Sequence, residues 1–186
     1  MNKKPKTITV DDFVLKPIPV TQKYAKQIFD AFHEDETSFR FWMEDGIYKT
    51  VQDVLNSYKT KYQDDKHWHY AMYGIFQDDD LLGEIGLSGI DIKNKTGEIG
   101  YWLRKSARGN GIINKLIPVI EEVGFDTLNL RKISIWCDTE NLPSLKHAEK
   151  QRYILEGVQR ERKLWNDGTV HSTAMFGKLK REWKKQ

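Results

Sequence analysis

The sequence predicts one mixed α/β domain over residues 1–186, with a central, mostly antiparallel twisted sheet flanked by helices. Three observations predict this fold class. The chain has 186 residues and 39% of them are hydrophobic, which suits a single core of ordinary size. Apolar residues alternate in several segments and recur at helical spacing in others. The order of these segments differs from the regular strand–helix alternation of a dinucleotide-binding fold.

The first half of the chain begins with helical patterns and then changes to alternation. The first helix follows a threonine cap, and the later strands are separated by a run of three aspartates that is typical of a turn. The expected elements are, in order, a strand over residues 8–18, a helix from Thr21 to about Asp35, a helix beginning after Thr50, and strands over residues 67–77 and 81–91.

The second half continues the sheet and ends in a hairpin. Asn166-Asp167-Gly168 is a strong signal for the turn of that hairpin. Pro118 lies inside an expected helix and should kink it, at a cost of roughly 3 kcal/mol if nothing compensates. The expected elements are a strand over 97–103, a helix from 112 to about 123, a strand over 132–137, a helix from 141 to about 151, and strands over about 154–165 and 169–178.

A glycine-containing loop, Arg108-Gly109-Asn110-Gly111, joins the strand that ends at Leu103 to the helix that begins at Ile112. Such a turn leaves several backbone N–H groups pointing one way at the positive end of the helix dipole, where they bind phosphate oxygens. The loop therefore predicts a nucleotide-like cofactor, and the alternative is an ordinary loop of no special role, in which two glycines in four residues also occur. A P-loop is excluded because no Gly-Lys-Ser/Thr follows the glycines.

Charge and composition exclude several classes of function. Lysine and arginine exceed aspartate and glutamate by only 30 to 27, and the charges are interleaved, so bulk polyanion binding is not expected. The basic C-terminal residues around Trp183 are more typical of a solvated chain end than of a nucleic-acid contact. These basic residues are Lys178, Lys180, Arg181, Lys184 and Lys185.

Cysteine and histidine usage bounds the location and the chemistry. The single cysteine, Cys137, excludes an internal disulfide and indicates a reducing compartment. No apolar stretch is long enough for a signal peptide or a membrane span, so we expect a cytoplasmic protein. His69 and His171 are more typical of structural residues than of proton relays, and no group of potential ligands has metal-binding spacing.

Four separate segments together resemble the GNAT superfamily of N-acetyltransferases, and within it the branch that acetylates the N-termini of ribosomal proteins. The resemblance covers nearly the whole chain. The segments are Gly100-Tyr101-Trp102-Leu103 with the loop through Ile112, Asn141 with Ser144, Leu155-Glu156-Gly157, and Lys180-Arg181-Glu182-Trp183.

The resemblance implies acetyl-CoA as the donor and a primary amine as the acceptor. It places the CoA pyrophosphate on the loop amides and the pantetheine arm along the strand edge near Trp102–Arg104. The expected cofactor-binding residues are Trp102, Leu103, Arg104, Arg108, Gly109, Asn110, Gly111, Ile112, Ile113, Asn114 and Asn141. Ile113 occupies a position where the superfamily usually has glycine or alanine.

Acetyl transfer to an amine needs a proton acceptor, donors for the developing oxyanion and an acid for the departing thiolate. Ser144 matches the family position whose hydroxyl faces the CoA sulfur, and its alternative role is to satisfy backbone groups at a helix start. Asn141 has the same two interpretations, a helix cap or a contact to the pantetheine arm.

The proton acceptor is left open by the sequence. Counting along the closing hairpin places Lys163 where some ribosomal-branch members have a glutamate, and lysine serves as a base only with a strongly lowered pKa. The alternatives are Glu161, two residues earlier and therefore on the same strand face, Glu84, Glu98 and a water relay. Each of these carboxylates is also typical of a solvated strand residue.

The acceptor site is expected between the first two helices and at the closing hairpin. Residues 33–45 mix acids with aromatics, which fits either a groove for a cationic amine or a helix end with solvated acids. The predicted function is acetylation of a protein N-terminus of the ribosomal type, or of a small amine or polyamine, and a homodimer is one option. The alternative is a degenerate acyl-CoA-binding sensor, for which Ile113 and Lys163 are the reasons.

Overall fold

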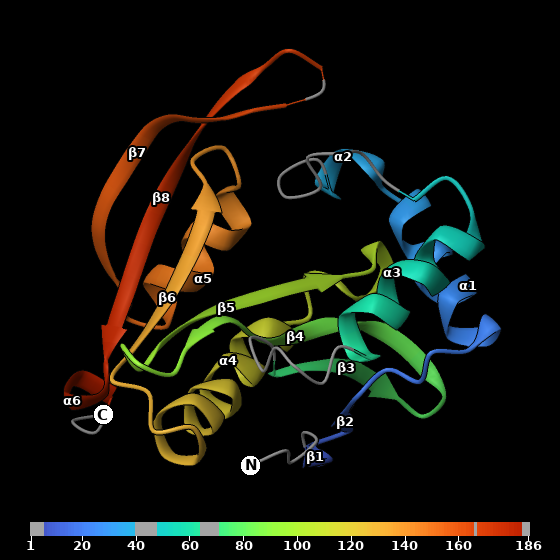
Figure 1. Cartoon of the computed structure of the whole chain (residues 1–186), viewed down its shortest axis with the longest axis horizontal. Coiled ribbons are helices and arrows are strands. Elements are labelled where there is room, and N and C mark those ends of the chain that lie inside the picture. The colour runs from blue at the N-terminus through green and yellow to red at the C-terminus, as the bar shows by residue number, and fades with distance from the viewer. Residues whose placement is uncertain (1–5, 40–47, 64–70, 166, 184–186) are drawn as a thin grey trace. The chain divides into compact units, whose positions relative to one another are not determined.

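A computed structural model describes residues 6–39, 48–63, 71–165 and 167–183 (Figure 1). The chain divides into two compact units. The first unit consists of Met1–Gly86 and Tyr101–Asn110, and the second of Leu87–Gly100 and Gly111–Gln186. A single domain over residues 1–186 stays a prediction.

The strands are hydrogen-bonded in the order β1-β2-β3-β4-β5-β6-β8-β7. The pairing of β5 with β6 is parallel, whereas β1–β2, β2–β3, β6–β8 and β7–β8 are antiparallel. This confirms the predicted mixed α/β class with a mostly antiparallel sheet. The strands are β1 (Ile8–Val10), β2 (Phe13–Lys16), β3 (Ala71–Gln77), β4 (Asp80–Asp91), β5 (Thr96–Leu103), β6 (Lys132–Asp138), β7 (Ile154–Leu164) and β8 (Val170–Leu179).

The helical segments agree with the predicted ones in order, with additions. Two short elements were not expected, α2 directly after α1 and α6 at the C-terminal end, because four residues are too few for periodicity to show. The helices are α1 (Gln22–His33), α2 (Glu36–Phe39), α3 (Val51–Gln63), α4 (Ile112–Glu122), α5 (Leu142–Lys150) and α6 (Lys180–Trp183), with a 3₁₀ turn η1 (Lys105–Ala107) and a π turn η2 (Val123–Thr127).

The expected strand over residues 8–18 is wrong in one respect, since the structure has two short strands there. Asp11 adopts a left-handed backbone with a φ of 50°, and β1 folds back on β2 with Ile8 opposite Leu15. Asp11 and Asp12 tolerate such a turn, so the alternation on either side belongs to a hairpin. The expected start of the strand at His67 lies outside the described residues.

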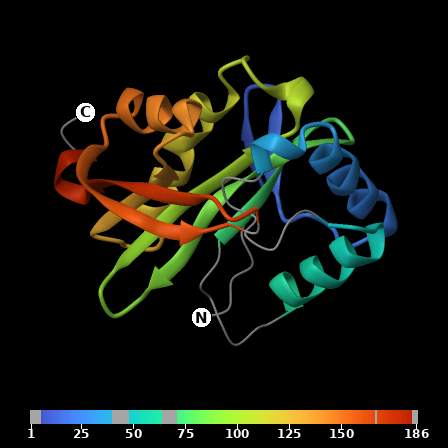
Figure 2. The ribbon, with the colours of Figure 1, turned by 90° about the horizontal axis from the view of Figure 1, so that it is seen from above.

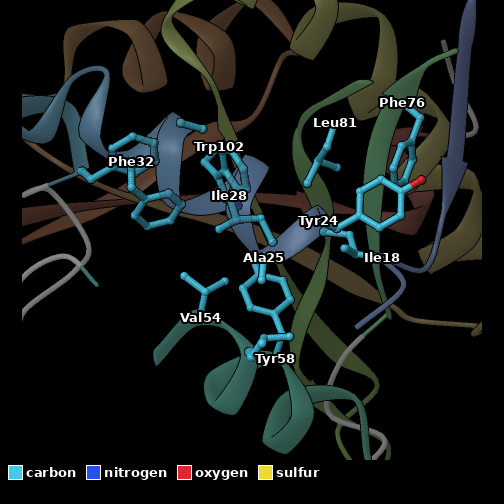
Figure 3. Packing of buried hydrophobic residues seen from close by; sticks show 13 residues of the cluster. Ile18, Tyr24, Ala25, Ile28, Phe32, Val54, Tyr58, Phe76, Leu81 and Trp102 are labelled. Atoms are coloured by element: carbon cyan, nitrogen blue, oxygen red, sulfur yellow. The ribbon is translucent and has the colours of Figure 1, made fainter. Parts of the chain in front are cut away.

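The core of the first unit is rich in aromatic side chains (Figure 3). The rings of Phe32 and Phe39 are stacked with centroids 4.0 Å apart, and Trp102 meets both of them edge-on. Buried rings bring a large apolar area and a fixed geometry, so they anchor the C-terminal end of α1 to the end of β5. Val54 and Tyr58 on α3 belong to the same cluster.

In the second unit, α4 packs beside α5 (Figure 2). The apolar stripe on α4, which includes Leu116, Ile117 and Ile120, is fully buried. α4 runs through Pro118 from Ile112 to Glu122, and the kink expected at Pro118 stays a prediction. A proline at 118 cannot donate to the carbonyl of Asn114. The side-chain amide of Gln151 donates to that oxygen instead, at 2.8 Å, and so replaces the missing hydrogen bond.

The basic C-terminal segment is partly built into the second unit. Lys178 is only 1% exposed, and its ammonium group lies 2.8 Å from a carboxylate oxygen of Glu121. Lys180 donates to the carbonyl of Phe125, whose ring lies 5.3 Å from that of Trp183. The prediction of a wholly solvated chain end is therefore wrong for these residues, while Lys184 and Lys185 lie outside the described residues. Within the described part of the chain, no helix is both long and apolar enough to cross a membrane.

Candidate active site

The two glycines of the loop after β5 share one backbone conformation. Gly109 and Gly111 are left-handed, with φ of 81° and 72°. A Cβ at either position would meet no atom within 4 Å, so the backbone angle alone favours glycine here. Gly111 is the N-cap of α4, and Asn110, the residue between the glycines, is exposed.

The start of α4 is suited to an anion. Gly111 has no side chain to accept from the first turn of α4, and that turn contains no acidic residue. The backbone N–H groups of Ile112, Ile113 and Asn114 therefore carry the positive end of the helix dipole without a side-chain cap. Ile113 is only 3% exposed, so its larger side chain is placed in the core rather than on the open side of the loop.

The side chain of Arg108 is directed back into the first unit. Its Nη1 donates to Oδ2 of Asp35 at 2.6 Å and to Oγ of Ser38 at 2.8 Å, and its Nε donates to the carbonyl of Leu103 at 2.9 Å. Arg104 forms an ion pair with Glu34 at 2.5 Å, and its backbone N–H donates to the carbonyl of Leu82 at 2.9 Å. Both guanidinium groups thus pair with the two acids that directly follow α1, Glu34 and Asp35.

These contacts change the expectation for the acidic segment. Glu34 and Asp35 are paired with arginines, and Phe39 is buried in the core of the first unit. Hydrogen bonds from Ser38 and Thr37, and then the Arg108 guanidinium, lower the pKa of Asp35 from 3.8 to about 2. Glu34 and Asp35 are therefore engaged by arginines, whereas Glu36 in the first turn of α2 is exposed, and residues 40–47 lie outside the described residues.

Trp102 and Glu84 form a buried polar contact in the first unit. Glu84 is 2% exposed, and its Oε2 accepts from Trp102 Nε1 and from the Tyr58 hydroxyl, each at 3.2 Å. A buried carboxylate needs such donors because burial alone penalises its charge. The alternative of a solvated strand residue is wrong for Glu84.

Glu98 and Glu161 lie in the second unit in different surroundings. Burial raises the pKa of Glu98, and the charges of Arg162 and Lys163 offset part of that rise. Glu161 is exposed on β7, has a φ of 50°, and donates its backbone N–H to Ser172 Oγ at 3.1 Å. The register of β7 shifts between Gln159 and Lys163, so the regular alternation behind the same-face prediction for Glu161 is wrong.

Asn141 and Ser144 lie together at the start of α5. The side-chain oxygen of Asn141 accepts the backbone N–H of Ser144 at 3.3 Å, which confirms the helix-cap interpretation of Asn141. Ser144 is the third residue of α5 and is half-buried. The cap leaves the amide nitrogen of Asn141 available for a second contact.

Residues 14–153 match the family described as the acetyltransferase (GNAT) domain. The chain belongs to this family. A ribosomal-protein-serine acetyltransferase of Escherichia coli (strain K12) is 33% identical over 124 residues, which are 67% of this chain and 65% of that protein. This GNAT chain thus spans slightly less than two thirds of that relative's length. The N-acetyltransferase YoaA of Bacillus subtilis (strain 168), which its name calls uncharacterized, is 26% identical over 177 residues, 93% of this chain and 96% of the relative.

Solved structures support the same fold. The microcin C7 self-immunity acetyltransferase MccE, solved in complex with acetyl-CoA and AMP, aligns with a TM-score of 0.81 and 23% identity. The alignment covers 91% of this GNAT chain and 93% of that protein. At this level of identity the likeness shows the fold.

One group of side chains in this GNAT protein was not predicted as a unit. His171 on β8 is 8% exposed, and its Nδ1 lies 2.8 Å from Oδ2 of Asp138 at the end of β6. Its Nε2 lies 2.9 Å from the Thr169 hydroxyl. With Glu140 these side chains form a group in which each residue offers one potential metal-ligand atom, and these atoms lie within 4.8 Å of one another. Asp138 and His171, however, already contact each other directly. Only the pairing of β6 with β8 brings these residues together, so spacing along the chain gave no signal.

Proposed function

We propose that this protein is an N-acetyltransferase that moves an acetyl group from acetyl-CoA to a primary amine. The observation that carries the proposal is the left-handed, uncapped start of α4 at Gly111 in a chain of the GNAT family. The name of the E. coli relative supports a protein N-terminus of the ribosomal type as acceptor, and a small amine or polyamine is the other class.

The cofactor is proposed to lie along the residues that precede and begin α4. The backbone amides from Gly109 to Asn114 would hold the pyrophosphate, and the strand edge from Trp102 to Arg104 would face the pantetheine arm. The Arg108 side chain would stabilise the loop, since its guanidinium already donates hydrogen bonds to Asp35 and Ser38. Asn141 would offer its amide nitrogen to the pantetheine arm.

The reaction joins the amine nitrogen to the acetyl carbonyl carbon and breaks the bond from that carbon to sulfur. One proton leaves the amine and one reaches the thiolate, for which we propose Ser144 as the donor. Among the carboxylates, Glu98 is the proposed proton acceptor. A half-buried carboxylate with a raised pKa binds a proton more readily than a carboxylate at its ordinary pKa, and Glu98 is such a group. Glu84 is the second candidate. It ranks after Glu98 because it is buried and its Oε2 already accepts hydrogen bonds from Tyr58 and Trp102.

Calorimetric titration of CoA into the wild type and two glycine variants tests the proposal. Gly111→Val forces a branched residue into a left-handed backbone at the phosphate loop, so CoA affinity should fall at least about tenfold. Gly168→Val is the matched control, because Gly168 has a φ of 82° and also no atom within 4 Å of its Cβ, yet it lies in the β7–β8 turn. Equal CoA affinity of Gly111→Val and the wild type would overturn the cofactor assignment.

Turnover is followed as free thiol, with acetyl-CoA and a panel of N-terminal peptides and polyamines. Thiol release with at least one acceptor supports the enzyme. CoA binding without thiol release across the panel would favour the acyl-CoA-binding sensor. The cytoplasmic location, a homodimer, and the absence of metal and nucleic-acid binding stay predictions from the sequence.

A further inference from the structure

The phosphate loop is tied to the segment after α1 by a network that lies wholly within the first unit. Arg108 uses three separate contacts, to Asp35 Oδ2 at 2.6 Å, to Ser38 Oγ at 2.8 Å and to the Leu103 carbonyl at 2.9 Å. Its guanidinium also lies 5.6 Å from the centre of the buried Phe39 ring. Arg108 therefore joins the end of β5, the loop and α2.

A second clamp lies one residue away on the same two segments. The carboxylate of Glu34 accepts from Arg104 Nη2 at 2.5 Å and from the backbone N–H of Lys105 at 3.2 Å. Both of its oxygens are used, one for a side chain and one for the main chain. This clamp holds the backbone that leads into the loop, so the segment after α1 contacts the approach to the loop at two adjacent points.

Asp35 is the centre of the first clamp. Its carboxylate accepts from the hydroxyls of Ser38 at 2.6 Å and Thr37 at 2.7 Å in addition to Arg108. The side chain is 19% exposed, and that of Arg108 is 31% exposed. Hydrogen bonds to an ionised group are stronger and more directional than neutral ones, so the three donors fix the carboxylate against α2.

We propose that Asp35 is a positioning residue that couples occupancy of the phosphate loop to the order of residues 33–39. The inference rests on the proposed function, because CoA is the ligand that occupies the loop. Gly109 follows Arg108 directly and is exposed, and glycine has more backbone freedom than any other residue to lose when phosphates bind. When the backbone of Arg108 becomes more restricted, α2 should become more restricted as well. The Arg108 guanidinium transmits this effect because it donates to the Leu103 carbonyl and also to Asp35 and Ser38. By linkage, order in residues 33–39 must in turn favour CoA binding.

Hydrogen exchange followed by mass spectrometry, with and without saturating CoA, tests this coupling in the full chain. In the wild type, CoA should slow exchange of the peptides covering residues 33–39. Asp35→Asn should lose this CoA-dependent slowing and bind CoA about five- to tenfold more weakly, the size of an ordinary coupling. Asp79→Asn is the matched control, since it removes a carboxylate that pairs with Lys23 at 2.7 Å in the same unit, and it should change neither quantity.

Ser38→Ala is a milder variant for use if Asp35→Asn does not fold. It removes one donor to Asp35 and one acceptor for Arg108, so an intermediate loss of the CoA-dependent slowing is expected. CoA binding to the wild type without slower exchange in residues 33–39 overturns the coupling alone. Unchanged slowing in Asp35→Asn also overturns it. Failure of the wild type to bind CoA overturns the proposed function and the coupling together.

Discussion

Replacing Gln151 with alanine should destabilise the protein by an amount that depends on Pro118. The side-chain amide of Gln151 donates at 2.8 Å to the carbonyl of Asn114, the oxygen to which a proline at 118 cannot donate. Removing one partner of a partly buried hydrogen bond costs about 1–3 kcal/mol, because the remaining group loses its partner. We therefore expect Gln151→Ala to lower the free energy of unfolding by about 1–3 kcal/mol.

A double-mutant cycle isolates this effect from other consequences of the substitution. Pro118→Ala restores a backbone N–H that can donate to Asn114 in the usual helical way. In the Pro118→Ala background, Gln151→Ala should then cost less than about 0.5 kcal/mol, since the carbonyl keeps a donor. The assay is urea unfolding of all four proteins, with constant m-values as the condition for comparing them.

The cost of Gln151→Ala with and without Pro118→Ala tests whether Gln151 compensates for the proline. A coupling free energy of at least about 1 kcal/mol between positions 118 and 151 supports the compensation. If Gln151→Ala costs the same in both backgrounds within about 0.3 kcal/mol, Gln151 does not replace the hydrogen bond that Pro118 lacks. Lys150→Ala, the neighbouring exposed position on α5, serves as a control without expected coupling.

Four further predictions concern single positions. Because the pKa of Asp35 falls from 3.8 to about 2 on folding, its ionised form stabilises the protein above pH 4, and this contribution is lost between pH 4 and pH 2. Asp35→Asn should thus lower the free energy of unfolding at pH 7 by about 1 kcal/mol, allowing for solvent screening. The difference in denaturant midpoint between the variant and the wild type should shrink below pH 4, and a pH-independent difference would contradict this. Lys178→Met should cost about 3–5 kcal/mol in urea unfolding, because Glu121 remains buried, whereas Lys178→Met with Glu121→Leu should cost less; an equal or larger loss in the double variant would contradict it. Arg152→Gly should raise the free energy of unfolding by about 1 kcal/mol, because Arg152 follows the Gln151 cap of α5 with a φ of 58°, and a lower Tm would be evidence against strain there. Burial raises the pKa of the Cys137 thiol to about 12, so iodoacetamide at pH 8 should label it in urea but not in the native protein, and rapid native labelling would refute this.

Features that depend on neighbouring residues could be predicted from the sequence. The sequence Arg108-Gly109-Asn110-Gly111 predicted a glycine-containing turn before a helix, and the structure has that turn, with both glycines left-handed. A helix cap was one of the two interpretations of Asn141, and it could be foreseen because the cap acts only three residues along the chain. The order of strands and helices followed from periodicity, while the break at Asp11 was missed because the residues on either side continue an alternating pattern.

The use of the site's side chains was decided by tertiary structure. Arg108 was expected near phosphate, but the fold brings Asp35 to its guanidinium, and Asp138 meets His171 only through the pairing of β6 with β8. Lys178 was expected to be a solvated cation, but the fold buries it beside Glu121. The sequence by itself determined the glycine-containing turn before α4 and the family. Only the tertiary structure decided which charges pair, because ion pairs between distant residues depend on strand register and helix packing, which local patterns do not encode.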